Sequence, residues 1–211
     1  MPSNDNANPT NSGARLPRRL VQLYVGLFCY GVSMALMVRG ELGLNPWDVL
    51  HEGLSFQTGL SFGTSVILVG AAVMLLWLPL RVRPGIGTIS NMLFIGLCAD
   101  FTLNFISAPD GYLLRSMMLA SGLVLCGAAT GAYIGAGLGP GPRDGLMTGI
   151  SARTGWPIRR IRTIIEVLAL TIGWVAGGTV GVGTVLFAVA IGPLVQFFLP
   201  IFTVNYSSRT E

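Results

Sequence analysis

The chain has 211 residues, of which 52% are hydrophobic and only 10% are charged. Ordinary globular chains carry about 25% charged residues, so this composition excludes a soluble protein, and the mean hydropathy of +0.67 indicates that lipid is the main solvent. The net charge of +4 comes from Arg residues in short clusters between apolar segments, which favours cytoplasmic loops over nucleic-acid binding.

Residues 1–14 are rich in Asn, Ser, Pro and Thr and contain no apolar run, so we expect a disordered cytoplasmic tail. Arg15, Arg18 and Arg19 follow, and they precede an apolar run that is similar to a signal peptide. Because no small-residue cleavage site follows and the chain stays apolar, we interpret this run as the first transmembrane helix. Residues 205–211 are expected to form a second cytoplasmic tail.

Six segments have few charges and approach the length of about 20 residues that a transmembrane helix needs. The second and fifth segments are the shortest, so we expect their ends to extend into neighbouring residues. The sequence therefore predicts an all-α polytopic membrane protein with transmembrane helices at 20–38, 64–80, 85–106, 113–135, 161–176 and 182–202.

Arg residues in the loops predict the orientation of these helices, because basic loops stay in the cytoplasm. They cluster before the first helix, between the second and third, and between the fourth and fifth, whereas the alternate loops hold few of them. Both termini are therefore predicted to be cytoplasmic, which requires an even number of spans.

The chain is similar to itself when it is shifted by 96 residues. Residues 42–59 then match residues 138–155 at nine of eighteen positions, whereas composition alone gives about two or three. We interpret this match as the duplication of a three-helix unit, with copies at 15–108 and 109–204. Each copy has an odd number of spans, so the second copy is expected to be inverted in the membrane, an architecture common in secondary transporters.

After its first span, each copy contains a segment that is too polar to cross the membrane but is patterned like a short helix. In the first copy, Asn45 is a suitable N-cap, Pro46 takes the first helical position and Asp48 the third. The second copy repeats this pattern at 141–144, and a glycine follows each segment as a natural C-cap, so each segment is predicted to form a helix of about twelve residues.

The glycine-rich turns before these short helices are expected to break the chain near the membrane and to leave backbone groups beside a polar cavity. The two helix N-termini would then frame a substrate path from opposite faces. An alternative is that Asp48 and Asp144 only complement the helix dipoles, which is worth about 0.3 to 1 kcal/mol. The pattern leaves open whether the helices re-enter the bilayer or lie at its interface. The predicted path consists of Gly43, Asn45, Pro46, Asp48, Gly139, Gly141, Pro142 and Asp144.

Further polar and aromatic residues are secondary candidates. His51, the only histidine, lies one turn from Asp48, which allows a proton role, although a solvated interfacial histidine is the commoner case. No third ligand accompanies this pair, so no metal site is predicted. Glu166 lies one turn past Arg162 and can simply pair with it. The secondary candidates are Trp47, His51, Glu52, Asp100, Arg143 and Glu166.

No catalytic motif emerges, because the chain has no HExxH sequence, no P-loop and no Ser/His/Asp order. We therefore expect that the protein is not an enzyme and that it has no catalytic residue and no cofactor. Cys29, Cys98 and Cys126 all lie in apolar segments without metal-ligand spacing, so we interpret them as small buried hydrophobic residues.

The stretch GLNPWDVLHEGLSFQTGLSFGTSVILVG, together with GLGPGPRDGLMTGIS and the GIGT and GVGT elements, resembles the YczE/YyaS/YitT family of bacterial integral membrane proteins. The resemblance covers nearly all of the chain after the tail, and PWDVLHEGLS is its specific part. It implies a polytopic protein of the bacterial cytoplasmic membrane. It carries no catalytic or ligand residue over to this chain, because biochemical activity is poorly defined across the family.

Two functions are compatible with these features. The first is a small-solute transporter or exporter that works by alternating access between the two copies. The second is a non-transporting accessory or scaffold protein that regulates a partner, with the charged segment 143–162 as its docking surface. The expected partners are the lipid bilayer and an unknown small solute, and we expect no binding of nucleic acid. The sequence leaves the oligomeric state open, and a homo-oligomer is one possibility.

Overall fold

The structure, a computed structural model, describes residues 15–203, and the regular secondary structure within this range is α-helical throughout. This result confirms the predicted fold class. The two predicted tails, 1–14 and 205–211, lie outside the described residues. In chain order the helices are α2 (Arg15–Gly40), α3 (Pro46–Thr58), α4 (Phe62–Leu75), α5 (Trp77–Leu80), α6 (Ile86–Leu103), α7 (Tyr112–Gly135), α8 (Pro142–Thr154), α9 (Ile158–Val175) and α10 (Val182–Phe202).

Five helices in the described range are long and apolar enough to cross a membrane. They are α2, α4 joined with α5, α6, α7 and α10, and they coincide with five of the six predicted spans. The chain is therefore a multi-pass integral membrane protein. The predicted fifth span lies in α9, whose N-terminal half carries Arg159, Arg160, Arg162 and Glu166. With these charges α9 is not among the five, and the count of six spans stays a prediction.

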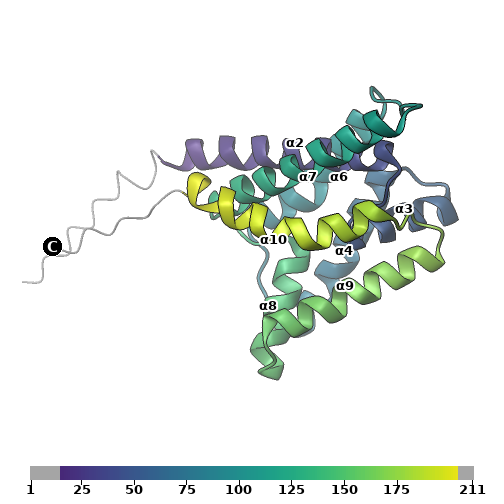
Figure 1. Ribbon diagram of the computed structural model, residues 1–211. Helices are drawn as coiled ribbons and strands as arrows, with labels where there is room; N and C mark the ends of the chain where they lie inside the picture. Colours follow the sequence, from purple (N-terminus) through teal and green to yellow (C-terminus); the bar gives the residue numbers. More distant parts are fainter. Residues whose placement is uncertain (1–14, 204–211) are drawn as a thin grey trace, which may run out of the picture.

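Helices α2 and α7 pack against each other, with α6 beside α2 and α10 beside α7 (Figure 1). The start of α2 lies next to the end of α10, because the Gln22 side-chain amide donates a hydrogen bond to the Phe202 carbonyl at 2.8 Å. The end of α2 lies next to the end of α6, where the Arg39 guanidinium donates to the Leu103 carbonyl at 2.7 Å. The end of α2, at Gly40, also lies close to the Arg115 backbone at the start of α7. Helices α2 and α6 are therefore parallel, whereas α7 and α10 run in the opposite direction.

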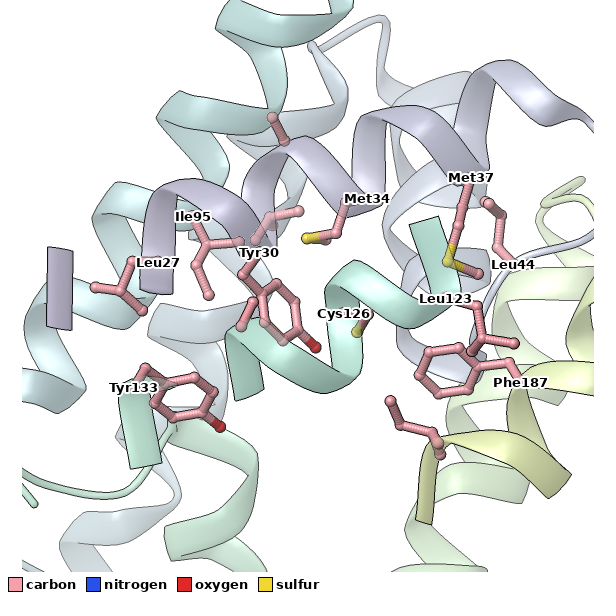
Figure 2. Packing of buried hydrophobic residues seen from close by; sticks show 14 of the residues in the cluster. Leu27, Tyr30, Met34, Met37, Leu44, Ile95, Leu123, Cys126, Tyr133 and Phe187 are labelled. Carbon is pink, nitrogen blue, oxygen red and sulfur yellow. The ribbon is translucent and has the colours of Figure 1, made fainter. Parts of the chain in front are cut away.

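The main core fills the space around α2 and α7 with aliphatic, aromatic and sulfur-containing side chains (Figure 2). Tyr30 and Met34 reach from α2 toward α7, where Leu123 and Cys126 belong to the same cluster. Large apolar side chains are exposed on the outer faces of the helices, as with Val189, which is 71% exposed. An extensive exposed apolar surface of this kind marks contact with lipid.

Positions separated by 96 residues, which we call equivalent positions, carry corresponding helices in the two halves. Helices α3 and α8 have 13 residues each, and Gly59 and Gly155 cap them in the left-handed conformation at φ angles of 71° and 72°. Both predicted short helices are therefore present. Two corresponding pairs, α2 with α7 and α6 with α10, run in opposite directions. An inverted duplication stays our interpretation of this match.

Each half caps the last helix of the other half. The Gly87 N–H at the start of α6 donates to the Leu138 carbonyl at 2.9 Å, and the equivalent Gly183 N–H of α10 donates to the Leu42 carbonyl at 2.7 Å. The residue after each acceptor has a positive φ angle, 111° in one loop and 128° in the other, and glycine is the residue that adopts it without strain. The two halves therefore complete each other's helix ends.

Candidate functional site

The starts of α3 and α8 face one cavity of about 240 Å³, which the exposed residues Arg162 and Gln196 also line. From α3 the cavity is lined by Asn45, Pro46 and Trp47, and from α8 by Arg143 and Asp144. Side chains from α2, α7, α9 and α10 complete the lining. The two helix starts that the sequence singled out thus lie at the same space, which has the concave, mixed polar and apolar character of a small-molecule site.

The side chains of α3 themselves fix its first turn. Asn45 Oδ1 accepts hydrogen bonds from the backbone N–H groups of Trp47 and Asp48, both at 3.0 Å, as an N-cap does. The Asn45 amide also donates to the Asp48 carboxylate, and His51 Nδ1 lies 3.3 Å from the other carboxylate oxygen. Asp48 is only 2% exposed and has partners for both oxygens, so its contacts are those of a residue that stabilises a helix start.

The first turn of α8 differs, because Gly141 has no side chain with which to cap it. Arg143 instead reaches α2, where its guanidinium donates to the Tyr30 hydroxyl and lies 5.8 Å from the centre of that ring. Asp144 accepts a hydrogen bond from the Tyr133 hydroxyl of α7 at 3.1 Å. The two tyrosine rings meet edge to face with their centres 6.2 Å apart.

Tyr30 and Tyr133 are site residues that the sequence analysis missed (Figure 2). Both lie in strongly apolar spans and are buried, which is why their apolar setting suggested core residues only. The available signal was the phenol hydroxyl itself, since a buried tyrosine hydroxyl usually needs a polar partner. Here those partners are the two charged residues at the start of α8.

Three polar groups at the cavity lack the partners that such groups normally have. Arg143 and Asp144 take part in no ion pair among the residues that the structure describes. The Trp47 indole N–H is buried and has no hydrogen-bond partner within the same part of the chain. By contrast, Trp77 Nε1 donates to the Pro142 carbonyl at 2.9 Å. Polar groups away from water are costly to leave unpaired. A ligand would therefore gain most binding energy from Arg143, Asp144 and the Trp47 N–H.

Other predicted residues tie helices together. Glu52 accepts the Thr179 N–H at 2.6 Å, which joins α3 to the loop after α9; burial raises the pKa of the Glu52 carboxyl, and this hydrogen bond opposes the rise. Glu166 pairs with Arg162 at 2.8 Å in the predicted manner. The two glycines at 43 and 139 do not line the cavity but pack against the starts of α10 and α6.

Cysteines and metal-ligating groups add no further site. Cys98 and Cys126 are buried, Cys29 is half-buried, and all three are free thiols. Over residues 15–203, no group of three or more His, Cys, Asp or Glu side chains is placed to hold a metal ion.

A smaller cavity, of about 60 Å³, lies beside α4 and α6. Eleven of the fourteen residues that line it have their equivalent residues in the lining of the larger cavity. His51 corresponds to Met147 in this way, for example, and Ile95 to Ile191. The two cavities are therefore counterparts in the two halves of the chain, but they differ fourfold in volume.

The packing of α4 on α6 explains why the smaller cavity is narrow. Gly63 and Gly96 approach so closely that a Cβ atom on either would overlap the carbonyl oxygen of the other. Asp100 of α6, a secondary candidate of the sequence, accepts hydrogen bonds from the Ser61 hydroxyl and from the Gly63 N–H, the latter at 2.6 Å. Asp100 therefore caps the start of α4 and holds that helix on α6.

The equivalent helices α9 and α10 stand apart instead. Helix α9 packs on α3, and α9 and α10 diverge from the loop that joins them (Figure 1). A Cβ atom on Gly192, equivalent to Gly96, would meet no atom within 4 Å. Gln196, equivalent to Asp100, lines the larger cavity together with Arg162 of α9. The larger cavity therefore extends into the space between α9 and α10.

Comparisons with known proteins give relatives of unknown function. A family model described as a family of unknown function, DUF6198, matches residues 17–200. An uncharacterized protein of Haemophilus influenzae is 41% identical over 85% of this chain and 82% of its own length. Two Bacillus subtilis proteins are also similar: the uncharacterized membrane protein YczE, 36% identical over 84% of this chain and 83% of its own, and the uncharacterized protein YyaS, 25% identical over 89% and 95%. No solved structure matches.

Proposed function

Because the chain belongs to the DUF6198 family, whose function is unknown, its role has to follow from its own geometry, and we propose that it is a small-solute transporter that works by alternating access. The relatives named YczE and YyaS confirm the resemblance noted in the sequence. In the proposed mechanism two inverted copies move against each other around a central site, without a chemical reaction. The protein acts in the bacterial cytoplasmic membrane with both termini in the cytoplasm.

The observation that carries this proposal is the pair of counterpart cavities with unequal volumes. Two copies with the same packing would give two cavities of the same size, whereas here one has about 60 Å³ and the other about 240 Å³. In our proposal the two unequal cavities belong to the two routes to the central site, and the larger cavity is the wider route. In the opposite state α4 and α6 would separate and α9 would move toward α10, although Arg159, which stands where α4 has Gly63, prevents an equally close contact.

A central group of side chains separates the two routes. Tyr30, Trp47 and Arg143 line both cavities, so a solute held by them can be reached from either one. The larger cavity also contains Arg162 near the start of α9 and Gln196 near the end of α10. The arginine bias of the loops assigns these helix ends to the cytoplasm, so the larger cavity is the cytoplasmic one in our proposal.

Distances between spin labels on matched helix pairs test the proposed exchange. Labels at Leu68 and Phe101 report on α4 and α6, and labels at the equivalent Ile164 and Phe197 report on α9 and α10; all four side chains are exposed. In lipid nanodiscs, double electron–electron resonance is expected to show two distance populations for each pair. The share of the long α4–α6 distance should rise as the share of the long α9–α10 distance falls.

A label pair at Val25 of α2 and Val124 of α7 is the matched control, because both side chains are exposed and their helices stay packed in the proposed mechanism. This pair should give one distance under all conditions. All three native cysteines are replaced by alanine before labelling. A single, unchanged distance for both test pairs across the pH values and lipids used would rule out alternating access.

The alternative of an accessory protein that docks a partner through residues 143–162 has less support. Its first basic residue, Arg143, is half-buried and its guanidinium donates a hydrogen bond to the Tyr30 hydroxyl of α2. Arg153, Arg159 and Arg160 are exposed, but exposed arginines are also what the cytoplasmic ends of membrane helices carry. We therefore base the experiments on transport.

A further inference from the structure

We propose that the larger cavity binds a small zwitterionic solute, with the anionic group of the solute at Arg143 and Trp47 and its cationic group at Asp144. This inference rests on the proposed function, since it names the class of solute that the same central site would carry. It follows from the charges, the unpaired donors and the volume of the cavity.

The two unpaired charges come first. Arg143 and Asp144 are neighbours in sequence, both line the larger cavity, and among the described residues neither forms an ion pair with the other or with a third residue. Arg143 has five N–H donors, and its only side-chain acceptor within this range is the Tyr30 hydroxyl. Asp144 receives one hydrogen bond, from Tyr133. A positive and a negative group thus face the same space, and each retains capacity for a ligand.

The Trp47 indole adds a neutral donor on the opposite helix start. Its side chain is only 7% exposed, lines both cavities, and its N–H has no acceptor among the described residues. A buried donor can gain a full hydrogen bond only from a group that brings its own acceptor. A carboxylate has acceptor capacity for an indole N–H as well as for a guanidinium.

Charge balance favours a zwitterion over an ion of one sign. The other charged residues of the cavity, Arg162 and Glu166, pair with each other. Arg143 and Asp144 therefore leave the lining without net charge. A simple anion would pair with Arg143 and leave Asp144 unpaired beside it, and a simple cation would do the reverse. A solute with one group of each sign pairs with both.

The volume limits the size of the solute. A cavity of about 240 Å³ has room for roughly eight water molecules at about 30 Å³ each. That space suits a solute of the size of a small amino acid.

Three matched probes test the assignment: L-alanine carries both charges, propionate has a hydrogen in place of its ammonium group, and ethylammonium has a hydrogen in place of its carboxylate. Their binding to the purified full chain in detergent is measured by isothermal titration calorimetry. We expect L-alanine to bind at least about tenfold more tightly than either singly charged probe, because each singly charged probe leaves one of the two charged side chains without a partner.

Two variants should invert this preference in opposite directions. Arg143→Gln leaves the cavity with a net negative charge, so ethylammonium should become the best probe of the three. Asp144→Asn leaves a net positive charge, so propionate should become the best probe. Glu41→Gln is the control, because Glu41 pairs with Arg115 away from the cavity and its loss should leave the order of the probes unchanged.

Equal binding of propionate and L-alanine, binding of none of the three probes, or an unchanged order in both charge variants overturns the assignment. If Arg143→Gln does not fold, Trp47→Phe replaces it, because this variant removes the unpaired N–H and should weaken L-alanine and propionate but not ethylammonium. Calorimetry measures equilibrium binding of the probes, and this binding does not depend on the proposed movement of the helices. A failure of this inference is therefore distinguishable from a failure of alternating access, which the spin-label distances report.

Discussion

Helices α4 and α6 form a closed contact, whereas their counterparts α9 and α10 are separated by a cavity. The difference lies in a few equivalent positions. Gly63, which allows close contact in the first half, corresponds to Arg159, and Asp100, which caps α4, corresponds to Gln196. The two halves therefore share a fold but differ in how their helices pack. In the proposed mechanism, these few positions would set which of the two states is preferred.

The largest expected effect concerns the glycines of the two contacts. Gly96→Ala places a Cβ atom against the Gly63 carbonyl oxygen and should destabilise the protein by about 1 to 3 kcal/mol. The equivalent Gly192→Ala meets no atom within 4 Å and should be neutral or stabilising, by up to about 1 kcal/mol. Chemical unfolding in detergent measures both changes.

The same pair of variants also tests whether α9 and α10 approach each other in the opposite state. If α9 moves toward α10 in the opposite state, a Cβ atom on residue 192 would obstruct that approach further. Gly192→Ala should therefore abolish the short distance between labels at Ile164 and Phe197. Equal destabilisation by Gly96→Ala and Gly192→Ala would show that the two helix pairs pack alike, and the comparison would be wrong.

A medium effect is expected at the helix cap. Asp100→Ala removes the carboxylate that accepts from Ser61 and Gly63, which should cost about 0.5 to 2 kcal/mol of the α4–α6 contact. The expected result is a larger share of the long distance between labels at Leu68 and Phe101. Gln196→Ala is the matched control in the other half, where it removes no such cap. An α4–α6 distance distribution that stays at the wild-type shape in Asp100→Ala would contradict the capping role.

The smallest effect concerns two indoles with different surroundings. Trp77→Phe loses the hydrogen bond to the Pro142 carbonyl and should lower the free energy of unfolding by about 1 kcal/mol. Trp47→Phe loses no hydrogen bond among the described residues and should change stability little. Thermal unfolding of the two variants side by side measures the difference. A larger loss of stability in Trp47→Phe would mean that its N–H has a partner.

Much of the fold was predictable because its signals are local. Apolar runs of about 20 residues identified the spans, and Asn45 with Pro46 identified the start of α3, where the asparagine cap is present. Helix α9, where a fifth span was predicted, is not among the five helices that are long and apolar enough to cross a membrane, because the charges in its first half lower its hydropathy. Local patterns therefore fixed where helices begin and end more surely than which of them cross the membrane.

The site was predictable only in part, because some of its contacts join residues that are far apart in the sequence. The starts of α3 and α8 could be singled out, since their patterns repeat. Tyr30 and Tyr133 could not, because a contact across more than one hundred residues, such as Arg143 with Tyr30, leaves no local pattern. The sequence also did not reveal that α4 packs closely on α6 whereas α9 and α10 stand apart. Arg159 and Gln196 are visible in the alignment of the halves, but their effect depends on where their helices lie.

The exchanged hydrogen bonds at the helix starts also bear on how the protein is made. The hydrogen bond from the Gly87 N–H can form only after Leu138 has been synthesised. The Leu42 carbonyl can accept its hydrogen bond only after Gly183 has been synthesised. The first half therefore leaves the ribosome with unfinished helix ends and must remain in the membrane until its counterpart arrives. A chain that ends before Leu138 would leave the Gly87 N–H at the start of α6 without this hydrogen-bond partner.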